Sequence, residues 1–374
     1  MTDATAIRKV TMPKWGLSMK EGTVTAWLAA EGATVAAGDE IVEIETEKVN
    51  NVVEAPVSGV LRRHVVGEGV TAPVGALIGI IAPAAVDDAA INAVVAEFAA
   101  SFVPVTEDSA GDAPVIRQVN GRSINSLLTG QGDATPAVLV HGFAADLTTW
   151  MFTQPALAEA RPVLSLDLPG HGASDKDVGA GDVAFFAGVL AATMDSAGIS
   201  HAHLIGHSLG AAIALQLALD APQRVASLTM IAPAGLGGSI DGGFLAALVA
   251  AERRRPAQEA LARLVADPSL VSRDMVERFL RYKRLDGVAA ALSTIAAQIA
   301  EGDRQRIDLG ASLARSGIPL LLIEGAADAI IAAAPDDMLP AGTIRHRIAG
   351  AGHLVHMEKS TTLNSMIGKF LSLN

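Results

Sequence analysis

A serine between two glycines is the first feature of this chain that could do chemistry. Gly206-His207-Ser208-Leu209-Gly210 follows the apolar run HAHLI and precedes the helical pattern AAIALQLAL. A Gly-x-Ser-x-Gly sequence at a strand-to-helix turn exposes the serine hydroxyl, because its glycines allow a very tight turn. A serine that only caps the helix is the simpler alternative. The preceding strand favours Ser208 as a nucleophile.

A serine hydroxyl needs a base to take its proton, and the base needs an acid to orient it. After such a turn, these partners follow in the order Asp or Glu, then His. Asp328 comes after the apolar run IPLLLIEG, and His353 comes after the strand-like TIRHRIA. Both are expected in loops that follow strands. We therefore predict a catalytic triad of Ser208, Asp328 and His353.

Other residues could take these two roles. Glu324 lies within the predicted strand end, and Asp336 and Asp337 lie beyond an Ala-rich segment. His356 could replace His353, although we expect it to start the final helix. The lone histidines are predicted to be strand or surface residues: His201, His203 and His346.

Acyl transfer also requires hydrogen-bond donors aimed at the oxyanion of the tetrahedral intermediate. The backbone N–H of Leu209, directly after the nucleophile, is one candidate. The second should come from the loop after PAVLVHGF, where Phe143 is the candidate. Neither donor depends on a side chain.

A lysine near the N-terminus is the other residue of chemical interest. Lys48, in Glu45-Thr46-Glu47-Lys48-Val49, joins the predicted strands EIVEIE and NVVEAP. Most lysines at such turns are simply solvated. Gly38 and Gly59, however, flank this turn at similar separations, halfway through a β-rich segment. This placement counts against an ordinary solvated lysine at Lys48.

Three regions must position these residues. Residues 1–82 contain short strands broken by Gly and Pro, typical of a small all-β sandwich or barrel. Residues 83–112 are rich in Ala, Pro and Asp and predict a linker with one short helix. Residues 113–374 alternate apolar runs with helical stretches, which predicts a mostly parallel sheet covered by helices. A helical insertion at about 237–305 is placed as a cap.

Composition excludes several classes of function. A net charge of −12 argues against nucleic-acid binding, and the run at 253–255 is expected to be a solvated helix face. The chain has no cysteine, which excludes disulfides and thiolate metal sites, and we predict no metal site. The apolar stretch 183–194 is too short to span a membrane, and the N-terminus lacks a signal-peptide pattern. We expect a cytoplasmic protein without membrane attachment.

Five motifs in order carry a resemblance to the α/β-hydrolase family over residues 115–374. They are HGF, DLPGHGAS, GHSLG, EGAAD and GAGH. The resemblance implies an α/β-hydrolase fold with a helical cap. It also implies that His171 and its neighbouring glycines shape a loop near the site without catalysing.

Residues 5–82 resemble the lipoyl domain of 2-oxo acid dehydrogenase complexes. The similarity rests on MPKWGLSMKEGTV, GDEIVEIETEKV and EAPVSGVL. It implies that lipoate is attached to Lys48 through an amide. Biotin carriers share this fold but usually have Met on both sides of the lysine. Here Glu47 and Val49 flank it, which favours lipoate.

A lipoyl domain followed by an α/β-hydrolase domain resembles the dihydrolipoyl acetyltransferase family of bacterial acetoin dehydrogenase systems. The resemblance implies acetyl transfer from lipoyl-Lys48 to coenzyme A, with acetyl-Ser208 as intermediate. The implied partners are thiamine diphosphate-dependent acetoin dehydrogenase subunits, dihydrolipoamide dehydrogenase and a lipoylating enzyme. A homo-oligomer is also implied.

Two features depart from ordinary acyltransferase components of such complexes. The chain lacks their His-x-x-x-Asp motif near the C-terminus, and residues 83–112 contain no recognisable peripheral-subunit-binding domain. How partner subunits dock is therefore left open.

Two alternative functions are carried alongside acyl transfer. A serine hydrolase or thioesterase acting on acyl-lipoamide or another ester would use the same triad. A non-catalytic scaffold is disfavoured, because no residue of the predicted triad is missing.

Overall fold

The computed structural model describes residues 7–13, 19, 21–46, 50–102 and 113–374. The chain folds as two compact units, residues 1–110 and 111–374. Lys48 lies outside the described residues.

The first unit consists of two antiparallel sheets of four strands each. Their strand orders are β1-β8-β6-β3 and β5-β4-β2-β7. Apolar side chains such as Val24, Ile44 and Ile80 are fully buried, as expected for a sandwich of short strands. The strands are β1 (Arg8–Thr11), β2 (Glu21–Trp27), β3 (Thr34–Val35), β4 (Glu40–Glu45), β5 (Asn50–Glu54), β6 (Gly59–His64), β7 (Thr71–Pro73) and β8 (Leu77–Ala82).

Helix α1 (Asp88–Ser101) forms within the segment predicted as a linker. Asp87 caps its start by accepting a hydrogen bond from the N–H of Ala89. Ile91 is fully buried and packs in one cluster with Leu77 and Ile80 of β8. The helix is therefore docked on the β-sandwich, and its apolar face explains why.

The second unit is built on a sheet of eight strands in the order β18-β17-β14-β13-β11-β12-β10-β9. From β12 to β18 all neighbours are parallel, while β9, β10 and β12 pair antiparallel. The strands are β9 (Val115–Val119), β10 (Arg122–Thr129), β11 (Ala137–Val140), β12 (Val163–Leu166), β13 (Ala202–His207), β14 (Val225–Ile231), β17 (Leu320–Gly325) and β18 (Ile344–Ile348).

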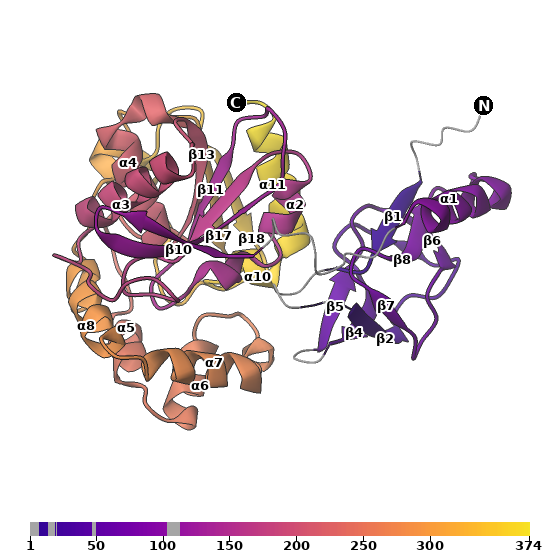
Figure 1. Ribbon diagram of the computed structural model, residues 1–374, viewed down its shortest axis with the longest axis horizontal. Coiled ribbons are helices and arrows are strands. Elements are labelled where there is room, and N and C mark those ends of the chain that lie inside the picture. The colour runs from indigo at the N-terminus through magenta and orange to yellow at the C-terminus, as the bar shows by residue number, and fades with distance from the viewer. Residues whose placement is uncertain (1–6, 14–18, 20, 47–49, 103–112) are drawn as a thin grey trace. The chain divides into compact units, whose positions relative to one another are not determined.

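Helices cover both faces of this sheet (Figure 1). Alternate residues of β11 point to opposite faces: Val138 and Val140 join the core with α3 and α4, whereas Leu139 joins the core with α11. The strand is thus apolar throughout because both of its faces are buried. The layer helices are α2 (Gln154–Ala158), α3 (Val183–Ser196), α4 (Leu209–Asp220), α9 (Gly310–Leu313), α10 (Val355–Glu358) and α11 (Ser360–Leu371).

The segment that follows β14 and precedes β17 along the chain forms a cap of four helices, where the sequence predicts an insertion (Figure 1). They are α5 (Gly242–Ala250), α6 (Arg254–Ala262), α7 (Arg273–Lys283) and α8 (Val288–Ile299), followed by the short pair β15 (Ala300–Glu301) and β16 (Arg304–Gln305). Val276, Phe279 and Leu280 of α7 are buried, so its apolar face packs inward.

The β9–β10 hairpin was not predicted from the sequence. Asn120 and Gly121 connect its strands with φ of 50° and 77°. Asn-Gly is the preferred pair for a tight hairpin turn because both residues tolerate positive φ. The Asn-Gly dipeptide is therefore the feature of the sequence that could have predicted this hairpin.

Candidate active site

The turn that carries Ser208, the predicted nucleophile, forms where β13 ends and α4 begins. Ser208 has φ 52° and ψ −117°, a strained conformation for a residue other than glycine. A Cβ at Gly206 would lie 2.4 Å from the carbonyl oxygen of Gly210, and one at Gly210 would lie 2.1 Å from that of Val140. The two glycines are therefore required by close backbone approach. The N–H of Ser208 donates to the carbonyl of Ile231 at 3.0 Å and ties the turn to β14.

Asp328 and His353 meet at the carboxyl end of the sheet. His353 Nδ1 lies 2.8 Å from Asp328 Oδ2. Asp328 Oδ1 accepts hydrogen bonds from the N–H groups of Ile330 and Ile331, at 2.8 and 3.1 Å. With Nδ1–H donating to the carboxylate, Nε2 is left as the basic nitrogen.

The charge of Asp328 is stabilised where it lies. Burial raises its pKa, but the neighbouring His353 and the two backbone donors outweigh burial, so the pKa lies below its ordinary value. An ionised carboxylate can orient the imidazole and stabilise it when it is protonated.

The rival residues have other partners. Glu324 is buried, accepts the N–H of Ala334 at 2.7 Å and pairs with Arg345 at 2.8 Å. Asp336 is exposed and pairs with the same arginine at 2.5 Å, and Asp337 is exposed as well. The other histidines considered lie at the surface or within strands: His201 is exposed, His203 is buried in β13 with its ring 2.8 Å from Ser227 Oγ, and His346 is in β18.

The structure brings Ser208 and His353 to one cavity, which both of them line. Within the described residues, no hydrogen bond joins the Ser208 hydroxyl to the imidazole. Such bonds are commonly long before substrate binds and tighten in the reacting complex.

The loop after β11 carries the second predicted oxyanion donor. Phe143 and Leu209 both line the cavity, and in the part of the chain that the structure describes neither N–H has a hydrogen-bond acceptor. The next residue, Ala144, has φ 57° and donates its N–H to His171 Nε2 at 3.1 Å. The other ring nitrogen of His171 lies 3.0 Å from the carbonyl oxygen of Pro169. His171 thus fixes the loop that carries Phe143, the predicted oxyanion donor.

Burial keeps His171 neutral. It lowers the pKa of His171 to about 3, with the neighbouring His141 adding to the effect. A neutral ring can accept the Ala144 N–H at one nitrogen while it donates at the other, which a protonated ring could not do.

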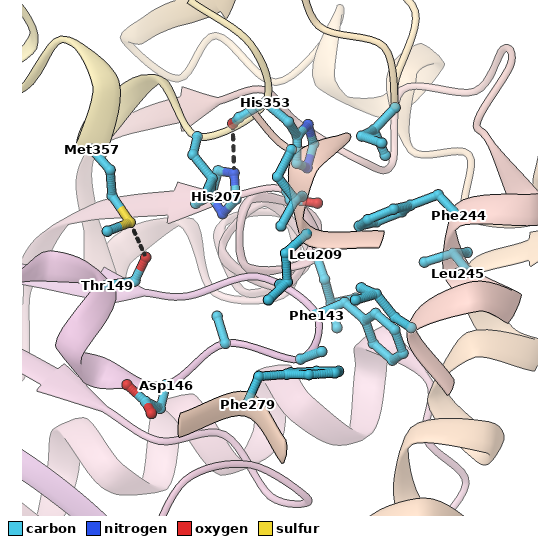
Figure 2. Close-up of a pocket in the computed structure, with 18 of the residues that line it drawn as sticks. Phe143, Asp146, Thr149, His207, Leu209, Phe244, Leu245, Phe279, His353 and Met357 are labelled. Atoms are coloured by element: carbon cyan, nitrogen blue, oxygen red, sulfur yellow. Dashed lines mark hydrogen bonds between the residues drawn. The ribbon is translucent and has the colours of Figure 1, made fainter. Parts of the chain in front are cut away.

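His207 contacts the backbone of His353, the predicted base, and the sequence did not indicate this contact. Its Nε2–H donates to the backbone carbonyl of His353 at 3.0 Å (Figure 2). The His207 ring centroid lies 4.9 Å from that of His353 and 4.5 Å from that of His356. Burial, followed by the neighbouring His356, holds the pKa of His207 well below its ordinary value. A neutral His207 therefore braces the loop that carries the predicted base.

His356 is a buried structural residue. Its Nε2 lies 2.8 Å from Thr149 Oγ1, and its ring packs on Trp150. Burial lowers its pKa to about 3. These contacts hold the His356 side chain in the buried core next to the site.

The cavity has a volume of about 170 Å³ and a mostly apolar lining. Figure 2 shows Phe143, Phe244 and Phe279 around the same space as His207 and His353. The cap contributes much of this lining, from α5, α6 and α7: Phe244, Leu245, Leu248, Leu261, Met275, Arg278, Phe279 and Tyr282. Such a lining limits the water that reaches the reacting bond.

Lys48, the predicted attachment site, lies outside the described residues, but the strands that precede and follow it are described. Strands β4 and β5 pair antiparallel, with Glu45 opposite Asn50 at the end of the register. Lys48 belongs to the short connection between these two residues. A hairpin in this place suits a lysine that carries a prosthetic arm.

Neither a metal site nor a membrane span is found in the described ranges. No group of three or more His, Cys, Asp or Glu side chains there is arranged to hold a metal ion. None of the helices described is both long and apolar enough to cross a bilayer.

Two families match the chain. Residues 135–360 match the family described as alpha/beta hydrolase fold, and residues 8–81 match the one described as biotin-requiring enzyme. The chain is similar to the dihydrolipoyllysine-residue acetyltransferase component of the acetoin cleaving system of Pseudomonas putida, with 45% identity over 98% of both chains. The corresponding component from Cupriavidus necator is 42% identical over 97% of this chain and 96% of its own.

A solved structure supports the fold of the second unit. The meta-cleavage product hydrolase from Pseudomonas fluorescens IP01 superposes with a TM-score of 0.61 at 20% identity, covering 70% of this chain and 97% of its own. These comparisons confirm the predicted lipoyl-type sandwich and α/β-hydrolase fold.

Proposed function

The chain belongs to the family of dihydrolipoyllysine-residue acetyltransferase components of acetoin-cleaving systems, and we propose that Ser208 carries the acetyl group during transfer. The protein moves acetyl from a lipoyl-lysine to coenzyme A and works as a component of a multienzyme system. The observation that carries the serine mechanism is the Asp328–His353 pair opening onto the cavity that Ser208 lines.

The first half of the reaction forms an acyl-enzyme. Lipoate, when attached, supplies the thiol that presents acetyl as a thioester. Ser208 Oγ attacks the thioester carbonyl while His353 Nε2 takes the hydroxyl proton. The N–H groups of Phe143 and Leu209 stabilise the oxyanion. The carbon–sulfur bond then breaks, and His353 returns the proton to the departing sulfur.

The second half repeats these steps with coenzyme A. Its thiol gives a proton to His353 Nε2 and attacks the acetyl-Ser208 carbonyl. Ser208 Oγ leaves and takes the proton back, so the triad returns to its starting state. The apolar cavity favours a thiol over water as acceptor, because it offers few polar groups to hold a water molecule.

The lipoyl carrier is assigned to Lys48. The hairpin of β4 and β5 and the match over residues 8–81 support this assignment. A thiamine diphosphate-dependent dehydrogenase would load the carrier, dihydrolipoamide dehydrogenase would reoxidise it, and a lipoylating enzyme would modify it. A cytoplasmic homo-oligomer is part of the proposal, and the cysteine-free sequence suits a reducing compartment.

The decisive experiment follows acetyl from the carrier to its acceptor. Acetylated, lipoylated protein is incubated with and without coenzyme A, for the natural chain and for Ser208→Ala. We expect acetyl-CoA from the natural chain alone and, without coenzyme A, acetyl on the peptide that contains Ser208. Equal acetyl-CoA from both proteins would refute the serine mechanism, and free acetate as the main product would establish a hydrolase.

The carrier assignment has a test of its own. Peptide mass spectrometry of protein made in lipoate-supplied cells should place lipoate on Lys48. Lys48→Arg should abolish the modification, while Lys9→Arg should not. Lipoate on another lysine, or a chain that stays unmodified, would contradict the assignment.

A further inference from the structure

The cap carries a concentration of positive charge on an otherwise acidic protein. From the N-cap of α6, Arg253, to the C-cap of α7, Arg284, the chain has nine basic and four acidic residues, a net charge of +5. The whole chain carries −12. Like charges on one small surface repel each other, so the part of this excess that has no partner within the chain does not stabilise the fold.

Many of these basic groups are already occupied. Arg254 pairs with Glu277, Arg255 with Glu259 and Arg263 with Asp241. Lys283 donates to the carbonyl of Leu248 at 3.1 Å and to that of Val249. These groups are less able to bind a ligand.

Two arginines of α7 differ from these groups: Arg278 lines the cavity, and Arg281 has no ion-pair partner among the described residues. Arg278 lines the cavity that holds Ser208 and is the one arginine or lysine among its described lining, where Asp146 is the one acidic group. Its Nε lies 2.9 Å from Asp274, while its terminal nitrogens have no partner among the described residues. Arg281, one turn further along, is exposed and makes no ion pair within the same residues.

We propose that Arg278 and Arg281 bind the phosphate groups of the acceptor thiol, coenzyme A, at the rim of the cavity. This inference rests on the proposed function, since it locates the acceptor at the same site. The sequence shows no recognisable phosphate-binding loop, so the phosphates of coenzyme A need other side chains to bind them.

The chemistry of α7 suits the two ends of such a ligand. Guanidinium groups donate in a planar fork that matches phosphate oxygens. Met275, Phe279 and Tyr282 recur at three- to four-residue spacing on the face of α7 that lines the cavity. A thiol-bearing arm can follow these side chains towards Ser208 while its phosphates stay with the arginines. Asp146 does not compete strongly, because its Oδ1 accepts from the Thr148 N–H and hydroxyl.

The test compares two acceptor thiols that differ in phosphate. Pantetheine has the same thiol arm as coenzyme A but lacks its phosphates. Kinetics of acetyl transfer to each acceptor are measured with the natural chain, with the double variant Arg278→Gln/Arg281→Gln, and with Arg255→Gln. Arg255 is the matched control, since it is an exposed arginine of α6 that does not line the cavity.

We expect the double variant to raise the KM for coenzyme A by about fivefold to tenfold, the range for partly exposed charge-assisted contacts. This rise in the KM for coenzyme A should be several times larger than any change in the KM for pantetheine. Added salt should weaken binding of coenzyme A to the natural chain more than binding of pantetheine. Arg255→Gln should leave the KM for both acceptors unchanged. Equal effects on both acceptors, or none, would overturn the proposal, as would a raised KM for the acetyl donor instead.

Equilibrium titration of coenzyme A without donor separates this inference from the mechanism. If Ser208 proves not to transfer acetyl to thiols, weaker binding by the double variant than by Arg255→Gln would still uphold the phosphate site. Identical binding by all three proteins would overturn it whatever the reaction is.

Discussion

Replacing Asp328 by Asn tests the triad most sharply, because the change keeps the shape of the side chain and alters its hydrogen bonding. The remaining carbonyl oxygen can still accept from the N–H groups of Ile330 and Ile331. The new amide, however, offers N–H donors where His353 Nδ1–H now donates at 2.8 Å. His353 resolves the conflict by moving its proton to Nε2, and the nitrogen that should accept from Ser208 is then no longer basic.

The expected effects on activity and stability differ in size. Loss of the basic nitrogen and of the carboxylate should lower kcat by about 10³ to 10⁴, or roughly 4 to 5.5 kcal/mol of transition-state stabilisation. The loop keeps its two backbone hydrogen bonds, although these weaken when the acceptor becomes neutral. The free energy of unfolding should therefore fall by only about 1 kcal/mol. The gap between these values identifies a catalytic role.

Initial rates of acetyl-CoA formation and urea unfolding measure the two effects on the same preparations. Asp336→Asn is the matched control: its carboxylate is 93% exposed and pairs with Arg345 on the surface. That control should stay within about twofold of the natural rate, as for most surface ion pairs. Asp328→Asn with more than a tenth of the natural kcat, or an equal loss in Asp336→Asn, would refute the assignment of the acid.

Three further predictions use the same assays. The folded-state pKa of Asp328 lies below its unfolded value of about 3.9, so the ionised side chain should contribute its full stabilisation above pH 3.9 and lose it as the pH falls towards the folded-state pKa. Between pH 6 and pH 3, the free energy of unfolding should therefore fall less steeply in Asp328→Asn than in the natural chain. Gly210→Ala should destabilise the fold by about 1–3 kcal/mol or more through backbone overlap, whereas Gly188→Ala, exposed on α3 with open space around its Cβ, should stabilise it by about 0.5–1 kcal/mol; similar urea midpoints for both would contradict the close approach. His207→Phe removes the donor to the His353 carbonyl and should lower kcat by about tenfold to 100-fold with little change in KM; an unchanged kcat would show that His207 only fills space.

The predicted triad positions came from local patterns that a single chain can show. Ser208 was indicated by glycines at a strand-to-helix turn, and the structure requires both glycines because neighbouring backbone leaves no room for a Cβ. Asp328 and His353 were placed in loops after strands, and the ends of parallel strands meet at one edge of a sheet. Continuous apolar runs predict β11, β13 and β17, because these strands are buried on both faces.

Residues with no local signature were missed. His207 occupies the variable position before the serine in Gly-x-Ser-x-Gly, yet its ring centroid lies 4.9 Å from that of His353 and 4.5 Å from that of His356, almost 150 residues later in the chain. Arg278 belonged to an ordinary amphipathic helix, and nothing in its neighbourhood indicated a place on the cavity wall. The β9–β10 hairpin joins the sheet antiparallel and is partly exposed, so it lacks the long apolar runs of the central strands.

The sequence by itself therefore determined which chemistry this protein can perform, since turn glycines, motif order and apolar periodicity act within a few residues of one another. The tertiary structure decided which acid pairs with His353, which histidines stay neutral, and which cap side chains share the cavity with Ser208. Those outcomes depend on burial and on contacts between residues distant along the chain. Hydrogen-bond geometry and desolvation exist only once the chain has folded.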